Sequence, residues 1–205
     1  MAPGDVQSAF AQAAASDRIA LGSQSFDWLC EQGHVGLERV AKARRDPALV
    51  APVTAAVEQL EAIYARLNGD VSVLHAAREN LLLPVDLVHE ATGTVVEVDD
   101  SAHFTSFRLA ALDLYRADTP VAFDLEEHKE LCRAWCSSTD GLESGLAAKG
   151  FGFGGVQHER AYYDALRDIA TPAMGRPPVV RIAAVDGDGA AAYRRHRDSL
   201  RTLLS

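Results

Sequence analysis

The sequence has no uninterrupted apolar stretch that approaches the ~20 residues a membrane-spanning helix requires. It also lacks the basic start and the continuous apolar segment of a secretory signal, because Asp5 and Gln7 stand at the beginning of an alanine-rich stretch. These absences exclude membrane insertion and export from our expectations. They predict a soluble protein that is located in the cytoplasm and has no membrane partner.

Cysteine is scarce. Cys30, Cys132 and Cys136 are too few, and odd in number, for a disulfide framework, which fits a reducing compartment. His128, Cys132 and Cys136 recur every four residues along one expected helix. Ligands on a single straight helix cannot surround a tetrahedral ion, so we expect the cysteines to pack as small apolar residues and not to bind zinc.

Basic residues are in the minority, at 20 Lys and Arg against 29 Asp and Glu, for a net charge of −9. This balance argues against indiscriminate binding to nucleic acid, which depends on cations meeting phosphates. The basic residues are unevenly placed, however. The last sixteen residues contain Arg194, Arg195, Arg197 and Arg201 against Asp198 alone, which predicts a basic surface on a terminal helix.

A length of 205 residues allows one core with a helical extension. Helical spacing dominates up to about residue 67, and nothing before Leu81 predicts a strand. A β-branched run from Val179 to Val185 predicts a buried strand near the end. We therefore expect an α/β protein in which residues 1–75 form a helical extension on a core of residues 76–205, with a helical insertion at about 105–157.

Acidic residues gather in one predicted β-hairpin, from Leu83 to Phe104. Asp86 lies on the first strand, and Glu97 and Asp99 share one face of the second because alternate residues of a strand point the same way. A turn centred on residues 91 and 92 places Asp86 opposite Glu97, and a turn centred on residues 92 and 93 places it opposite Asp99. Either register brings like charges together, so the acids need a cation or a raised pKa.

Carboxylate and carbonyl oxygens are the ligands that Mg²⁺ prefers, and such a cation promotes phosphodiester hydrolysis by neutralising the phosphate and activating water. Asp86, Glu97, Asp99 and the carbonyl of Val98 are candidate ligands. His103, just beyond the second strand, is a candidate for moving a proton or orienting a water. A surface hairpin in which His103 simply pairs with one acid is the alternative.

The order of these residues resembles the PD-(D/E)xK nuclease superfamily, in particular the branch related to very-short-patch-repair endonucleases. Asp86 matches the Asp of the first strand, and Glu97-Val98-Asp99-Asp100-Ser101-Ala102-His103 matches Glu-x-Asp-Gly-x-x-His, with Asp100 in place of Gly. The resemblance implies a restriction-endonuclease-like fold, which is a small mixed β-sheet flanked by helices. It also implies Mg²⁺- or Mn²⁺-dependent cleavage of DNA, with metal held by Asp86, Glu97 and Asp99 and with His103 as the fourth catalytic residue.

Two arginines, Arg160 and Arg167, lie seven residues apart on one predicted helix and therefore share a face. The resemblance extends to this helix and to the strand after it, and implies that both arginines meet phosphate. A local pair with Asp164 on a solvated face is the alternative. Superfamily members often carry a further acid on an upstream helix, and Glu79 is our preferred match over Glu58 and Glu61.

The chain departs from the wider superfamily at Asp99, where a lysine is usual and none lies nearby in sequence. This departure leaves a second hypothesis open, in which the chain is a catalytically silent nuclease-like module that binds nucleic acid or a partner protein. A hydrolase acting on another substrate is a third. The amphipathic N-terminal helices offer a surface for a homodimer or a cover for the sheet.

Overall fold

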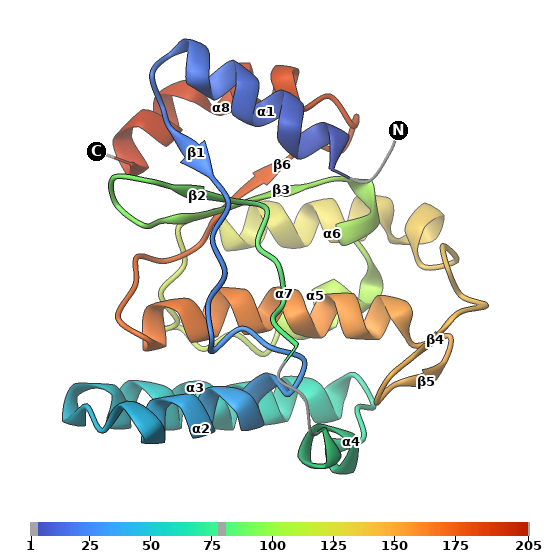
Figure 1. Cartoon of the computed structure of the whole chain (residues 1–205). Coiled ribbons are helices and arrows are strands. Elements are labelled where there is room, and N and C mark those ends of the chain that lie inside the picture. The colour runs from blue at the N-terminus through green and yellow to red at the C-terminus, as the bar shows by residue number, and fades with distance from the viewer. Residues whose placement is uncertain (1–3, 78–80, 205) are drawn as a thin grey trace.

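The computed structural model describes residues 4–77 and 81–204. A four-stranded sheet with the order β1-β2-β3-β6 lies between helical layers (Figure 1). Its strands are β1 (Leu21–Gly22), β2 (Leu87–His89), β3 (Val95–Asp99) and β6 (Val180–Ala183). The pairs β1–β2 and β2–β3 are antiparallel and β3–β6 is parallel, so the sheet is mixed. The expected α/β class and the small mixed sheet are confirmed, whereas the restriction-endonuclease-like fold stays a prediction.

One face of the sheet is covered by α1 (Asp5–Ser16) and α8 (Gly189–Leu203), which pack side by side (Figure 1). The alternation of β3 explains this layer, because Val96 and Val98 point towards these helices and Glu97 and Asp99 point away from them. Phe10 of α1 and Leu200 of α8 belong to the same buried cluster. This face is therefore an ordinary apolar core.

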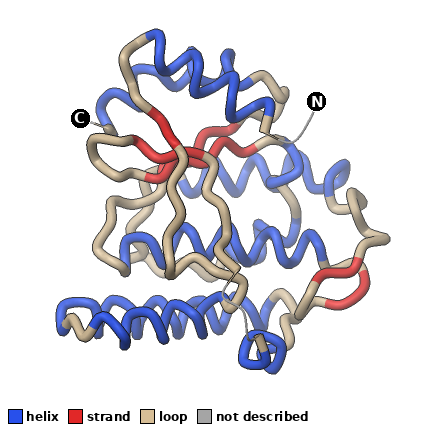
Figure 2. Tube along the Cα trace, viewed as in Figure 1, coloured by secondary structure: helices blue, strands red, loops and turns tan. Residues whose placement is uncertain are grey.

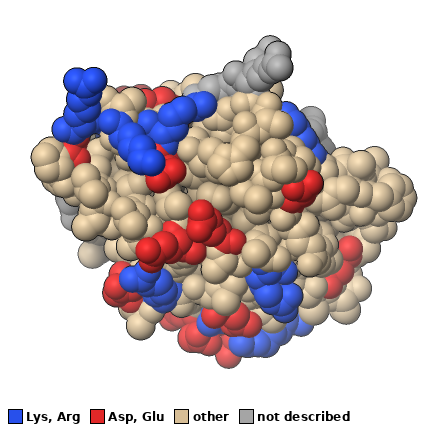
Figure 3. Space-filling view, turned by 90° about the horizontal axis from the view of Figure 1, so that it is seen from below, with Lys and Arg blue, Asp and Glu red and all other residues tan. Residues whose placement is uncertain are grey.

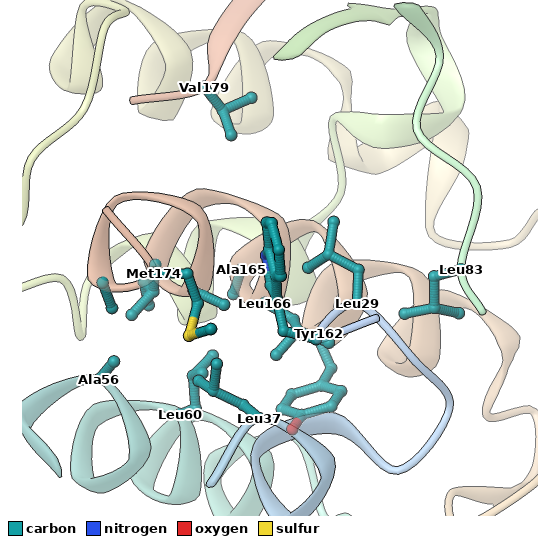
Figure 4. Close-up of a cluster of buried hydrophobic side chains, with 14 of the residues drawn as sticks. Leu29, Leu37, Ala56, Leu60, Leu83, Tyr162, Ala165, Leu166, Met174 and Val179 are labelled. Atoms are coloured by element: carbon teal, nitrogen blue, oxygen red, sulfur yellow. The ribbon is translucent and has the colours of Figure 1, made fainter. Parts of the chain in front are cut away.

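The other face of the sheet meets α7 (Val156–Ala173), α5 (Ser106–Leu112) and α6 (Leu125–Thr139). Beyond α7 lies a further helical layer of α2 (Gly33–Arg44), α3 (Pro47–Arg66) and α4 (Val71–Ala76). Leu37 and Leu60 from this layer pack with Tyr162 and Leu166 of α7 in a large buried cluster (Figure 4). The apolar side of α7 thus packs against the layer of α2 and α3. Polar residues of α7, among them Asp164 and Arg167, face the sheet near Glu97 and Asp99.

Short elements complete the chain, in which strands are a small part (Figure 2). A 3₁₀ turn, η1 (Ser101–His103), follows β3 directly, and β4 (Ala147–Ala148) and β5 (Gly152–Phe153) form a separate two-stranded ribbon. Thr105 caps the start of α5, because its hydroxyl accepts the backbone N–H of Arg108. No helix among the described residues is long and apolar enough to cross a membrane.

The predicted hairpin forms with the first of its two registers. Leu87 pairs with Val96, which sets Asp86 opposite Glu97. The expectation that no strand precedes Leu81 is wrong, because Leu21 and Gly22 pair with His89 and Val88. A strand of two residues carries no readable periodicity, which is why the pattern missed it. The division into an extension and a core stays a prediction, but β1 joins the sheet from within residues 1–75 and α1 covers one of its faces.

Candidate functional site

Asp86 and Glu97 form a pair of acids across β2 and β3. Each carboxylate accepts a backbone N–H from the partner strand: Glu97 Oε1 from Asp86 at 3.2 Å, and Asp86 Oδ2 from Val98 at 2.8 Å. Glu97 is only 3% exposed, and Asp86 is half-buried. These reciprocal bonds fix both carboxylates at the end of the hairpin pairing, where the register predicts them.

Gln7 of α1 reaches into this pair. Its Nε2 donates to Asp86 Oδ2 and to the carbonyl of Val98, both at 3.4 Å. These are two of the oxygens that the sequence predicts as metal ligands, and they converge on one amide nitrogen. Gln7 also lines a groove of about 680 Å³ together with Asp100, Ala102 and Arg160. Its side chain therefore stands between this groove and the acid pair.

Arg181 of β6 forms ion pairs with three further acids, Asp99, Asp164 and Asp168. Its Nη1 donates to both oxygens of Asp99, at 2.8 and 3.0 Å. Its Nε donates to Asp168 at 2.7 Å, and its Nη2 lies 3.3 Å from Asp164 Oδ1. The parallel register, which aligns Arg181 with Glu97, puts the guanidinium on the acidic face of the sheet. All three carboxylates are at least nine-tenths buried, so this guanidinium is the centre of an interior ion network.

Arg108 of α5 enters the network from the far side. Its Nη2 donates to Asp168 Oδ2 at 2.6 Å, and the hydroxyl of Tyr115 donates to the same oxygen at 2.7 Å. His128 of α6 approaches Asp99 Oδ2 only to 3.9 Å, and its Nε2 is buried without a hydrogen bond to the described residues. Burial and the nearby Arg108 lower the pKa of His128 to about 4, so this imidazole is neutral.

His103 is the most accessible member of the cluster, with a quarter of its side chain exposed. Its Nδ1 lies 3.0 Å from Asp164 Oδ2 and 3.5 Å from Asp99 Oδ1. Although burial acts to lower it, these two carboxylates raise the pKa of His103 to about 9. His103 therefore carries a proton at neutral pH, which suits a proton donor or an anion contact and not a general base.

The charges of the cluster divide into a balanced and an unbalanced part. Three carboxylates, of Asp99, Asp164 and Asp168, meet the three cations of Arg108, Arg181 and protonated His103, so their formal charges sum to zero. Although burial opposes them, these cations hold the pKa of Asp99 below its ordinary value and that of Asp164 well below it.

The unbalanced part is the acid pair. Among the charged side chains described, only Arg167 approaches Glu97 within ion-pair distance, at 3.6 Å, and none approaches Asp86 so closely. Burial raises the pKa of Glu97 to about 7 against the opposing effect of Arg167. Burial also raises the pKa of Asp86, although the bond from Val98 works the other way. The sequence predicts that the clustered acids require a cation or a raised pKa, and Asp86 and Glu97 are the acids whose pKa is raised.

The two arginines predicted to meet phosphate occupy different settings. Arg167 donates to the carbonyl of Pro84, at 2.8 and 3.2 Å, and turns inward beside Glu97. Arg160 lines the groove and pairs with Glu143 at 2.8 Å. Arg167 forms the local pair of the alternative, with Nη1 3.5 Å from Asp164 Oδ1, but the pair is buried and not on a solvated face. Arg160 forms no such pair among the described residues, and Asp164 also meets Arg181 and His103. Glu79, the predicted upstream acid, lies outside the described residues.

The donor set fits a hard cation in kind, but it is smaller than predicted. Asp86, Glu97 and the Val98 carbonyl supply oxygen only, and Mg²⁺ is commonly held by one or two carboxylates with water completing its shell. Both Asp86 and Val98 already direct an oxygen at the Gln7 amide. Asp99 directs both oxygens at Arg181, and no group of three acidic, His or Cys side chains able to hold a metal is found within residues 4–77 and 81–204.

Sequence reasoning missed Arg181, Asp168 and Arg108 as members of the site. Arg181 interrupts an apolar strand, and a charged residue in a buried strand demands a buried partner. That pattern alone could have placed Arg181 among the acids. Arg108 gives no comparable signal, because one arginine in a short amphipathic helix is ordinary.

The comparisons with known proteins add no relative. No protein family, no curated protein and no solved structure matches the chain.

Proposed function

We propose that this chain hydrolyses phosphodiester bonds of DNA with a divalent cation, at a site centred on Asp86 and Glu97. The observation that carries the proposal is a pair of acids that meets one cation, Arg167. Asp86 Oδ2 and the Val98 carbonyl both face Gln7, which lines a groove. A buried acid with a raised pKa and a specific charge partner near a groove is a candidate for a functional residue.

In this proposal Asp86, Glu97 and the Val98 carbonyl hold Mg²⁺ or Mn²⁺. The bound cation would neutralise charge on the phosphate and lower the pKa of water. Arg167 holds Glu97 in place from behind, and Arg160, on the wall of the groove, exchanges Glu143 for a phosphate. Protonated His103 donates to the leaving oxygen.

The test combines metal binding with DNA nicking by the full chain. We expect Mn²⁺ binding by calorimetry and nicking of a supercoiled plasmid in Mn²⁺, with Asp86→Asn slowing the nicking by about 100-fold or more. Asp118→Asn is the control, because this carboxylate is 78% exposed and distant in the chain from the pair. If the parent neither binds Mn²⁺ nor nicks DNA, and Asp86→Asn behaves like the parent, the proposal is wrong.

The second candidate is a silent nuclease-like module that binds nucleic acid or a partner protein. The ion pairs of Arg181 with Asp99, Asp164 and Asp168 favour this candidate, because the arginine supplies the positive charge that a metal ion would otherwise supply to these acids. Equal DNA binding by the parent and by Asp86→Asn, with no cleavage by either protein in Mg²⁺ or Mn²⁺, would support this candidate over the enzyme.

A further inference from the structure

The outermost layer of the molecule, α2 and α3, carries an apolar groove that nothing in the described chain fills. The two helices form a hairpin on the side of α7 away from the sheet (Figure 1). A groove of about 450 Å³ lies near the end where they join, lined by Ala41, Leu49, Val50, Val53 and Val57. Val50 at its margin is 65% exposed. An exposed apolar strip with a charged rim is typical of a protein-binding surface.

The rim of this groove carries charges of both signs. Lys42 and Arg45 line it from α2 and the turn that follows, together with Glu38 and Asp46, and Glu58 lines it from α3. Arg39 and Glu61 each lie three residues from a rim residue and so on the same side of its helix. The bases Arg39, Lys42 and Arg45 thus form one row and the acids Glu58 and Glu61 another. Figure 3 views the molecule from this side, with one group of Lys and Arg at the upper left, a row of acids across the middle, and further residues of both signs below it.

Part of the charge is neutralised within α2, where Lys42 pairs with Glu38 at 2.7 Å. The side chains of Arg39, Arg45, Glu58 and Glu61 form no ion pair with the residues that the structure describes, and all four are exposed. A surface that carries both signs in separate rows is poorly suited to nucleic acid, because the acids repel phosphate. It suits a partner with the same two rows in the opposite order.

We propose that this face binds a second copy of the chain, in a two-fold pairing that lays α3 of each copy over α2 of the other. A two-fold axis brings the same patch of both copies together, so a cationic row and an acidic row on one patch each meet their opposite. The apolar residues around Val50 would then be shielded from water at the centre, and the charges would set the orientation.

The first test measures mass as a function of concentration, by sedimentation equilibrium of the full chain. We expect a monomer–dimer equilibrium for the parent that Val50→Glu weakens by at least tenfold. Val71→Glu is the matched control, because Val71 is also exposed, at 46%, but lies on α4 outside the groove. A parent that stays monomeric at every concentration, or a dimer equally stable in Val50→Glu, would overturn the proposal.

The second test uses charge reversal and does not depend on one contact. A variant with Glu58→Arg and Glu61→Arg, and another with Arg39→Glu and Arg45→Glu, should each fail to pair with itself, because the reversed charges then have the same sign as the unpaired charges of the facing helix. Mixed together they should form a one-to-one dimer, since every row again meets its opposite. Self-association of either variant at the parental strength, or no association on mixing, would contradict the two-fold arrangement.

Discussion

Arg181 of β6 and Asp99 of β3 lie side by side on adjacent parallel strands, and one nitrogen of the guanidinium donates to both oxygens of the carboxylate. The cation that Asp99 meets comes from the next strand of the sheet, and it faces inward. The polar face of the sheet is thus organised around an arginine that solvent does not reach.

Removing this guanidinium should strongly destabilise the fold. Arg181→Met leaves three buried carboxylates without their shared cation, for an expected loss of roughly 3–5 kcal/mol in the free energy of unfolding. Urea unfolding at neutral pH measures the loss. Arg195→Met, which breaks the exposed pair with Asp186, is the control and should cost less than about 1 kcal/mol. Equal losses in the two variants would show that the network contributes no more than a surface pair.

Glu97→Gln should make the protein more stable above neutral pH. The pKa of Glu97 is about 7 in the folded protein, above its ordinary 4.5, so the folded state favours the protonated acid. The contribution of protonated Glu97 to the free energy of unfolding is fully present below pH 4.5 and is lost as pH rises through 7. The amide cannot ionise, so we expect a gain of roughly 1–3 kcal/mol over the parent at pH 8. Urea unfolding at pH 4.5 and pH 8 checks this, with parent and variant similar at the lower value.

His103 should produce a separate loss of stability at higher pH. Its pKa is raised from 6.5 to about 9, so its contribution is fully present below pH 6.5 and is lost as pH rises through 9. The parent should therefore lose roughly 1–3 kcal/mol across this interval, and His103→Gln should lose much less. His75→Gln, at an exposed position on α4, is the control and should follow the parent. A parent and a His103→Gln variant with the same pH profile would contradict the assigned protonation.

Gln7→Ala should open the path from the groove to the acid pair. Under the proposed function, removing the amide frees Asp86 and the Val98 carbonyl for a cation. We expect Mn²⁺ to bind about three- to tenfold more tightly, in line with two lost hydrogen bonds. Calorimetry of the full chain measures the affinity. Gln12→Ala, an exposed position on the same helix, should leave it unchanged. Weaker binding in Gln7→Ala would make Gln7 a ligand-positioning residue and not an obstruction.

The sequence predicted the parts of the fold whose signals are local. The hairpin, one of its two registers and the strand near Val180 follow from alternation and from a turn residue that tolerates positive φ, Gly93. The contact of Asp86 with Glu97 follows from that register alone. These features depend on neighbours within about ten residues, which a single sequence records.

The partners of the acids are not local, and the sequence could not assign them. Asp168 binds Arg181 from 13 residues away and Arg108 from 60. Which arginine meets which acid depends on how α5 and α7 cross the sheet, and no periodicity encodes that crossing. Gln7 approaches Asp86 across 79 residues, and nothing marks it as different from the other glutamines of the alanine-rich segment.

The alignment of Arg181 with Glu97 also bears on how the sheet assembles. Pairing of distant parallel strands is slow because it closes a long loop, and here β3 and β6 are about 80 residues apart. A slip of one residue would turn Arg181 towards α1 and α8 and leave Asp99 facing α7 without its cation. We therefore expect the ion network to disfavour a slip of one residue more strongly than an apolar core would, whether or not the acids ever hold a metal.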